Sequence, residues 1–152
     1  MMIRKEIRSA TETTSGVFHV NKWGQQLEEN LIELLIELAS LNPKRKARLC
    51  LHPTPSEIMQ VTYIAFSRPY SDQIHKHPHR PEIVIPIYGL ALHSVYDHDG
   101  MILRSQTLDG KNPVASITEM NSLHNIEVLS ENFVMIEIGT GPFMPTSTIY
   151  TD

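Results

Sequence analysis

The 152-residue sequence predicts a mainly β protein with one helical segment near its N-terminus. Two observations carry this prediction. Only residues 23–41 repeat apolar side chains at three- and four-residue steps, which is the spacing of one helix face. After residue 44, short apolar or alternating runs follow one another between turn-forming residues, which is typical of an antiparallel sandwich or barrel. We therefore expect an N-terminal segment, residues 1–44, and a β domain, residues 45–152, that together form one compact unit.

The helix is predicted to begin after Asn21, a possible N-cap, and to end before the dipeptide Asn42-Pro43. Its predicted apolar face consists of Trp23, Leu27, Leu31, Leu34, Leu35 and Leu38.

Seven runs are predicted to contain the strands, and aspartate-glycine pairs at 99–100 and 109–110 supply turns between them. The triplet GTG at 139–141 is interpreted as a further turn, because it is too short for a phosphate loop and no helix follows it. The runs are ARLCLH, IMQVTYIAF, EIVIPIYGLALHSVYD, MILRSQTL, VASIT, NIEVL and FVMIEIG.

Composition excludes several classes of protein. The net charge of −4 gives no overall basic field that would favour nucleic acid. The single cysteine, Cys50, excludes an internal disulfide and a multi-cysteine zinc site, and it reads as a small buried hydrophobe. The most apolar stretch, LIELLIELA, contains glutamates and is too short to cross a bilayer. We see no signal peptide, so we expect a cytoplasmic protein without a membrane partner.

The stretch HKHPHRPE, residues 75–82, places three histidines and a glutamate within eight positions. Residues two apart on a strand point to the same face, so His75 and His77 project together if QIHKH is a strand. A turn across PHRP followed by a strand at Glu82 would aim this carboxylate at the same point. Imidazoles with a carboxylate suit a borderline divalent metal.

His79 is predicted to stay outside this cluster. Pro78 and Pro81 each remove a backbone donor and fix φ, so the chain is expected to turn and carry His79 away from the shared face. We expect His79 at the rim of the cavity instead. The remaining histidines His19, His93 and His98 have no partner spacing and are interpreted as surface or core residues.

The run HKHPHRPEIVIPIYG resembles the first motif of the cupin superfamily, in which histidine-x-histidine is followed by glutamate and then glycine at these spacings. The resemblance implies a jelly-roll β-barrel with a metal held by His75, His77 and Glu82. It implies His124 in EMNSLH as a fourth ligand, although Asn121 stands where the second cupin motif has glycine. Asparagine tolerates positive φ next best after glycine, so Asn121 can form the tight turn that glycine forms in the cupin motif.

The segments RKARLCLH, YDHDG and IEIGTGPF resemble the WbuC-type cupin metalloproteins more narrowly, and this resemblance covers roughly residues 40–145. It implies a metal site and says little about the substrate. We expect one divalent transition metal per chain, which is iron, manganese, nickel, cobalt or zinc. On the same resemblance, the candidate pocket residues are Arg48, His52, Gln60, Tyr63 and His79.

Two functions follow as hypotheses. The first is a metalloenzyme of isomerase or dioxygenase type that acts on a small oxygenated substrate, such as a sugar derivative or a keto acid. Its catalytic base would come from Tyr63, His79 or His52, because Glu82 is occupied as a ligand. The alternative is a non-catalytic module that binds or senses a metal or metabolite. We also expect a homodimer, because the apolar helix face needs a surface to cover.

Overall fold

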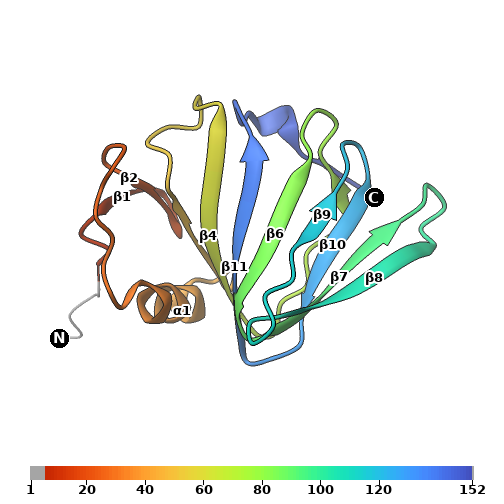
Figure 1. Cartoon of the computed structure of the whole chain (residues 1–152), viewed down its shortest axis with the longest axis horizontal. Helices are drawn as coiled ribbons and strands as arrows, with labels where there is room; N and C mark the ends of the chain where they lie inside the picture. Colours follow the sequence, from red (N-terminus) through yellow and green to blue (C-terminus); the bar gives the residue numbers. More distant parts are fainter. Residues whose placement is uncertain (1–5, 152) are drawn as a thin grey trace.

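Two β-sheets face each other in the computed structural model, which describes residues 6–151 (Figure 1). One sheet has seven strands in the order β1-β2-β3-β4-β11-β6-β9, and the other has five in the order β12-β5-β10-β7-β8. The chain is therefore mainly β, as the sequence predicts. The strands of the large sheet are β1 Ala10–Thr14, β2 Val17–Val20, β3 Lys46–Cys50, β4 Met59–Ser67, β11 Asn132–Thr140, β6 Glu82–Tyr88 and β9 Ser116–Thr118. Those of the small sheet are β12 Ile149–Tyr150, β5 His75–Lys76, β10 Leu123–Val128, β7 Leu90–Tyr96 and β8 Ile102–Asp109.

Strand alternation divides the apolar residues between two cores. On β4, Ile64 and Phe66 face the space between the sheets, and they pack with residues such as Phe133. Ala65 faces the other way, toward helix α1 (Leu31–Leu41), where Leu35 and other helix residues cover the outer face of the large sheet. The side-chain period of two thus gives each central strand one face for the sandwich and one for the helix.

The N-terminal segment differs from the prediction. The helix starts at Leu31 rather than near Trp23, and Asn30 occupies its N-cap position. Gly24 adopts φ +74, which breaks a helix, and Trp23 is 48% exposed. Leu27 still packs against the helix-side core, so the apolar spacing continues through a segment that is not helical.

Two strands before the helix are missing from the prediction. β1 and β2 form an antiparallel pair, and β2 then pairs in parallel with β3 through Val17 and Arg48. Strands of five and four residues are too short to show a clear period, and the β2–β3 partners lie about thirty positions apart. The last strand, β12, has two residues and is also missing from the prediction.

The run EIVIPIYGLALHSVYD forms two strands in different sheets, β6 and β7, with Gly89 between them. Gly89 has φ +75, and a Cβ built there would lie 2.1 Å from the Asn132 carbonyl oxygen. Only glycine fits this corner, where the chain leaves the large sheet for the small one. Within residues 6–151, no helix is long and apolar enough to span a membrane.

We expect Gly89→Ala to lower the free energy of unfolding by about 3–5 kcal/mol, because it combines left-handed backbone strain with a steric clash. Gly100→Ala is the matched control: Gly100 has φ +81, but nothing lies within 4 Å of its built Cβ. That variant should lose only about 1–2 kcal/mol. Urea unfolding of the two variants measures the difference, and equal losses would contradict the packing argument at Gly89.

Candidate metal centre and its cavity

Three histidines from the small sheet come together at one end of the space between the sheets. His75 lies on β5 opposite His124 on β10, and His77 directly follows β5, two residues after His75. One ring nitrogen from each of the three lies within 4.8 Å of the others, so they can hold a metal ion. The two-residue spacing therefore brings His75 and His77 to the same face, and strand pairing adds His124.

Glu82 brings a carboxylate from the large sheet to the same point. It is the first residue of β6, its side chain is buried, and the turn at residues 78–81 connects it to His77. Its Oε1 lies 3.0 Å from Nε2 of His77, and its Oε2 lies 3.4 Å from Nε2 of His124. Glu82 therefore touches two of the three imidazoles, one with each oxygen.

The turn before His124 uses asparagine where the cupin motif has glycine. Asn121 adopts φ +63, as the sequence argument requires for this departure to be tolerated. Its backbone N–H donates to the His77 carbonyl oxygen at 2.8 Å. The same turn thus leads into the strand that carries His124 and fixes the backbone of His77.

Hydrogen bonds fix the tautomer of all three rings. Each Nδ1–H donates to a backbone carbonyl: His75 to Gln73 at 2.8 Å, His77 to Ser147 at 3.0 Å, and His124 to Ser122 at 2.8 Å. In a neutral imidazole the other nitrogen then carries a lone pair. The three Nε2 atoms are therefore prepared as ligands, and backbone partners hold their orientation.

This donor set fits a divalent transition metal. If Nδ1 is protonated, His77 and His124 can donate to Glu82 only by carrying a second proton, which makes each ring a cation. A metal ion would replace those protons and accept the Nε2 lone pairs beside the carboxylate. Burial alone would raise the pKa of Glu82, but hydrogen bonds with His124 and His77 outweigh it and hold this pKa below its ordinary range. The carboxylate is therefore ionised at neutral pH, as a ligand must be.

His93 supports the centre from behind His124. It is buried on β7, its ring packs edge-on against His124, and Ser116 Oγ lies 2.7 Å from its Nδ1. Burial, together with the charge of His124, lowers the pKa of His93 to about 4. His93 is thus a neutral core histidine, in agreement with one of its two predicted readings.

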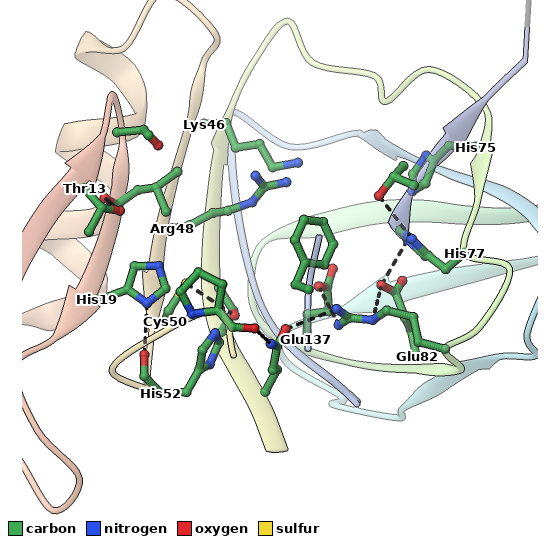
Figure 2. Close-up of a pocket in the computed structure, with 18 of the residues that line it drawn as sticks. Thr13, His19, Lys46, Arg48, Cys50, His52, His75, His77, Glu82 and Glu137 are labelled. Carbon is green, nitrogen blue, oxygen red and sulfur yellow. Dashed lines mark hydrogen bonds and ion pairs between the residues drawn. The ribbon is translucent and has the colours of Figure 1, made fainter. Parts of the chain in front are cut away.

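A cavity of about 370 Å³ opens from His75, His77 and Glu82 and runs along the inner face of the large sheet. Alternate residues of β3 line it, because positions two apart on a strand face the same side. Figure 2 shows Lys46, Arg48 and Cys50 projecting from this strand, with His52 just beyond it. Thr13 and His19 of the N-terminal strands form the far wall.

A buried cation and a carboxylate that the sequence argument missed lie between the two ends of the cavity. Arg80 is 7% exposed, and its guanidinium lies 3.7 Å from both Glu82 and Glu137 and 3.2 Å from Gln60 Oε1. Gly139 makes room for it, since a Cβ there would lie 2.1 Å from Nη2 of Arg80. This glycine is part of β11 and not of the predicted turn.

Two sequence signals mark these residues in retrospect. Glu137 is the one charged residue in FVMIEIG, and it shares strand parity with Phe133 and Met135, which face the inside of the sandwich. Arg80 stands between the prolines of the histidine motif itself. Burial raises the pKa of Glu137, and the charge of Glu82 adds to this shift.

A second group of donors, His19, Cys50 and His52, also has ligand atoms within 4.8 Å of one another. Here the hydrogen bonds are less favourable for a metal. The Val61 N–H donates to Nδ1 of His52 at 3.3 Å, so the proton of the neutral ring sits on Nε2 and no lone pair is left. Burial raises the pKa of the Cys50 thiol and lowers that of His52 to about 4. We interpret this group as a polar wall of the cavity.

Comparison with known families and structures places the chain. A family model described as a domain of unknown function, DUF6016, matches residues 27–108. The chain belongs to this family. A search of curated protein sequences finds no match to the DUF6016 chain.

Solved structures share its fold at low sequence identity. The capsular polysaccharide assembling protein CapF from Staphylococcus aureus aligns with a TM-score of 0.61 and 18% identity, over 69% of the DUF6016 chain and 29% of CapF. Oxalate decarboxylase from Lactobacillus farciminis aligns with a TM-score of 0.52 and 16% identity, over 62% of the DUF6016 chain and 27% of the decarboxylase. KdgF from a Halomonas species aligns with a TM-score of 0.55 and 15% identity, over 70% of the DUF6016 chain and 87% of KdgF. The DUF6016 chain thus spans less than a third of CapF, and these likenesses show a cupin-like fold, as the sequence predicts.

The pocket candidates divide into two groups. Arg48, His52 and Gln60 line the cavity. Tyr63 does not: it packs with the helix-side core, because it differs in strand parity from Gln60 on the same strand. His79 is exposed and does not line the cavity, so it lies outside the histidine cluster as predicted but farther from the cavity than the predicted rim.

We expect the wild-type chain to bind about one divalent metal ion, and His75→Ala, His77→Ala and Glu82→Ala each to lose it, because each removes a donor from the cluster. His124→Ala should weaken binding by orders of magnitude. His79→Ala is the matched control from the same loop and should keep near-full occupancy. Elemental analysis after chelator treatment, reloading and dialysis measures the stoichiometry. Stoichiometric metal in a triple alanine variant of residues 75, 77 and 82 would contradict the assignment.

Proposed function

We propose that the DUF6016 chain is a metal-dependent enzyme that acts on a small oxygenated substrate, such as a sugar derivative or a keto acid, by isomerisation or dioxygenation. The observation that carries this proposal is the position of the histidine cluster at the end of a cavity of small-molecule size that charged side chains also line. The WbuC-type resemblance of the sequence supports the metal site alone. In this proposal His75, His77, His124 and Glu82 hold one iron, manganese, nickel, cobalt or zinc ion.

The bound metal would act as a Lewis acid or redox centre toward an oxygen of the substrate. The protein's own contribution is to orient the ligand nitrogens through backbone carbonyls, as described above, and to keep the substrate in a partly enclosed site. Gln60 Nε2 donates to Pro55 O at 2.8 Å while its Oε1 accepts from Arg80, so this amide is fixed at the cavity wall. Such fixed groups favour one substrate orientation.

We propose Glu137 as the group that moves a proton. Three carboxylates line the cavity: Glu82 belongs to the metal cluster, and Asp72 accepts from Tyr70 and Lys46. Within residues 6–151, the one ion pair of Glu137 is with Nη2 of Arg80 at 3.7 Å, and the side chain lies at the cavity (Figure 2). His52 suits the role less well, since its pKa of about 4 and its bond from Val61 make it a neutral donor.

Metal-dependent turnover in a panel of 2-oxo acids, sugar phosphates and neutral sugars tests the proposal, with protein loaded in turn with each of the five metals. Turnover should vanish in His75→Ala. Metal-dependent ligand binding without turnover for any metal would favour the alternative, a non-catalytic binding or sensing module.

For the active metal and substrate, Glu137→Gln should lower kcat by roughly 10²–10⁴-fold, the usual contribution of a general acid or base. Its metal stoichiometry should stay unchanged. Glu127→Gln is the matched control, since Glu127 is exposed on β10. A kcat that Glu137→Gln leaves within twofold of the wild type would exclude Glu137 as the proton carrier.

The homodimer that the sequence predicts stays a proposal. Its original reason is weakened, because the apolar face of α1 packs on its own sheet. Exposed apolar residues on the edge strand β8, such as Ile102 and Leu103, offer another surface. A light-scattering mass near 17.3 kDa at micromolar concentration would reject the dimer.

A further inference from the structure

Arg48 directs a guanidinium into the cavity without a protein partner. Figure 2 shows its side chain extending from β3 beside Lys46, toward the space in front of the histidine cluster. Across residues 6–151, this guanidinium has no hydrogen bond and no ion pair. The five N–H donors of this half-buried side chain therefore make no hydrogen bond to the protein.

The other two cations of the cavity are already engaged. Lys46 Nζ lies 3.5 Å from Asp72 Oδ1 and donates to Tyr70 Oη at 3.1 Å. Arg80 contacts two carboxylates and Gln60, as described above. The geometry therefore leaves Arg48, among the cationic residues that line the cavity, as the one whose donors are free for a ligand.

The balance of charge points the same way. Lys46, Arg48 and Arg80 face three carboxylates in the cavity lining, so the protein groups cancel formally. A divalent metal in the histidine cluster would leave an excess of positive charge. Burial is the main cause that lowers the pKa of Lys46 to about 8, and the charge of the neighbouring Arg48 adds to it. An anionic ligand would relieve this excess, whereas a neutral one would not.

We propose that Arg48 binds an anionic group of the substrate, a carboxylate or a phosphate, while another part of the same molecule lies at the histidine cluster. The inference rests on the proposed function and narrows its substrate class to acids and phosphorylated compounds. The planar guanidinium can donate two parallel hydrogen bonds to either group, which sets orientation as well as affinity. The cavity is near the lower end of ligand-site volumes, so the substrate is small.

Calorimetric titration with pyruvate and with inorganic phosphate tests this site. The full chain is titrated both loaded with zinc and stripped of metal, so that binding to the metal itself is separated from binding to Arg48. We expect Arg48→Gln to weaken the affinity for at least one anion by roughly 10- to 100-fold in both forms. Arg48→Lys keeps the charge without the planar fork and should recover only part of the loss. The more affected anion identifies the group.

Lys44→Gln is the control. This substitution removes the same charge from the same basic run, but Lys44 is exposed and lies outside the cavity. It should leave both affinities within twofold of the wild type. Equal effects of Arg48→Gln and Lys44→Gln, or no binding of either anion to the wild type at millimolar concentration, would overturn the inference. Unfolding midpoints of the variants check that each is folded.

Failure of the proposed function has a different signature. If no substrate turns over but anion binding still depends on Arg48, the anion site stands and the enzyme proposal fails. If a neutral sugar turns over with a kcat/KM that Arg48→Gln leaves unchanged, the enzyme proposal stands and the anion site fails.

Discussion

The buried carboxylate of Glu82 is the constraint on which the arrangement of the site depends. An ionised carboxylate that is 5% exposed destabilises a protein unless cations or hydrogen-bond donors surround it. Its partners here are His77, which follows β5, and His124 on β10, both from the small sheet, while Glu82 itself begins β6 of the large sheet. One side chain therefore joins the two sheets at the end where they enclose the cavity. Glu82, His77 and His124 therefore belong both to the candidate metal site and to the contact between the sheets.

The same carboxylate sets up the electrostatics of the whole cavity. Its negative charge contributes to the raised pKa of Glu137, and Arg80 stands between the two acids at 3.7 Å from each. Nε of Arg80 is buried without a hydrogen bond, so the two carboxylates, the hydrogen bond from Nη1 to Gln60 and the space above Gly139 hold the guanidinium. The chain thus places an arginine between Glu82 and the half-buried Glu137, which limits the repulsion between the two carboxylates.

Local spacing made the grouping of His75, His77 and Glu82 predictable, and long-range strand pairing decided the rest of the candidate site. His75, His77 and Glu82 lie within eight residues, and the strand period with two prolines is enough to bring them together. The φ of +63 at Asn121 could also be anticipated from its residue type. Tyr63 was placed wrongly because a one-residue change of parity moves a side chain to the other face of the sheet. Arg80 and Glu137 meet only because β6 pairs with β11, which no local pattern reveals.

The N-terminal strands form one end of the cavity. The histidine cluster and its carboxylate occupy the cupin-like sandwich, whereas Thr13, Val17 and His19 of β1 and β2 close the far end of the cavity. The DUF6016 model begins at residue 27, after both strands. The parallel pairing of β2 with β3 sets His19 beside Cys50, and so places these walls next to the strand that carries Arg48. The histidine cluster therefore lies at one end of the cavity, and residues of the strand pair before the helix line the other.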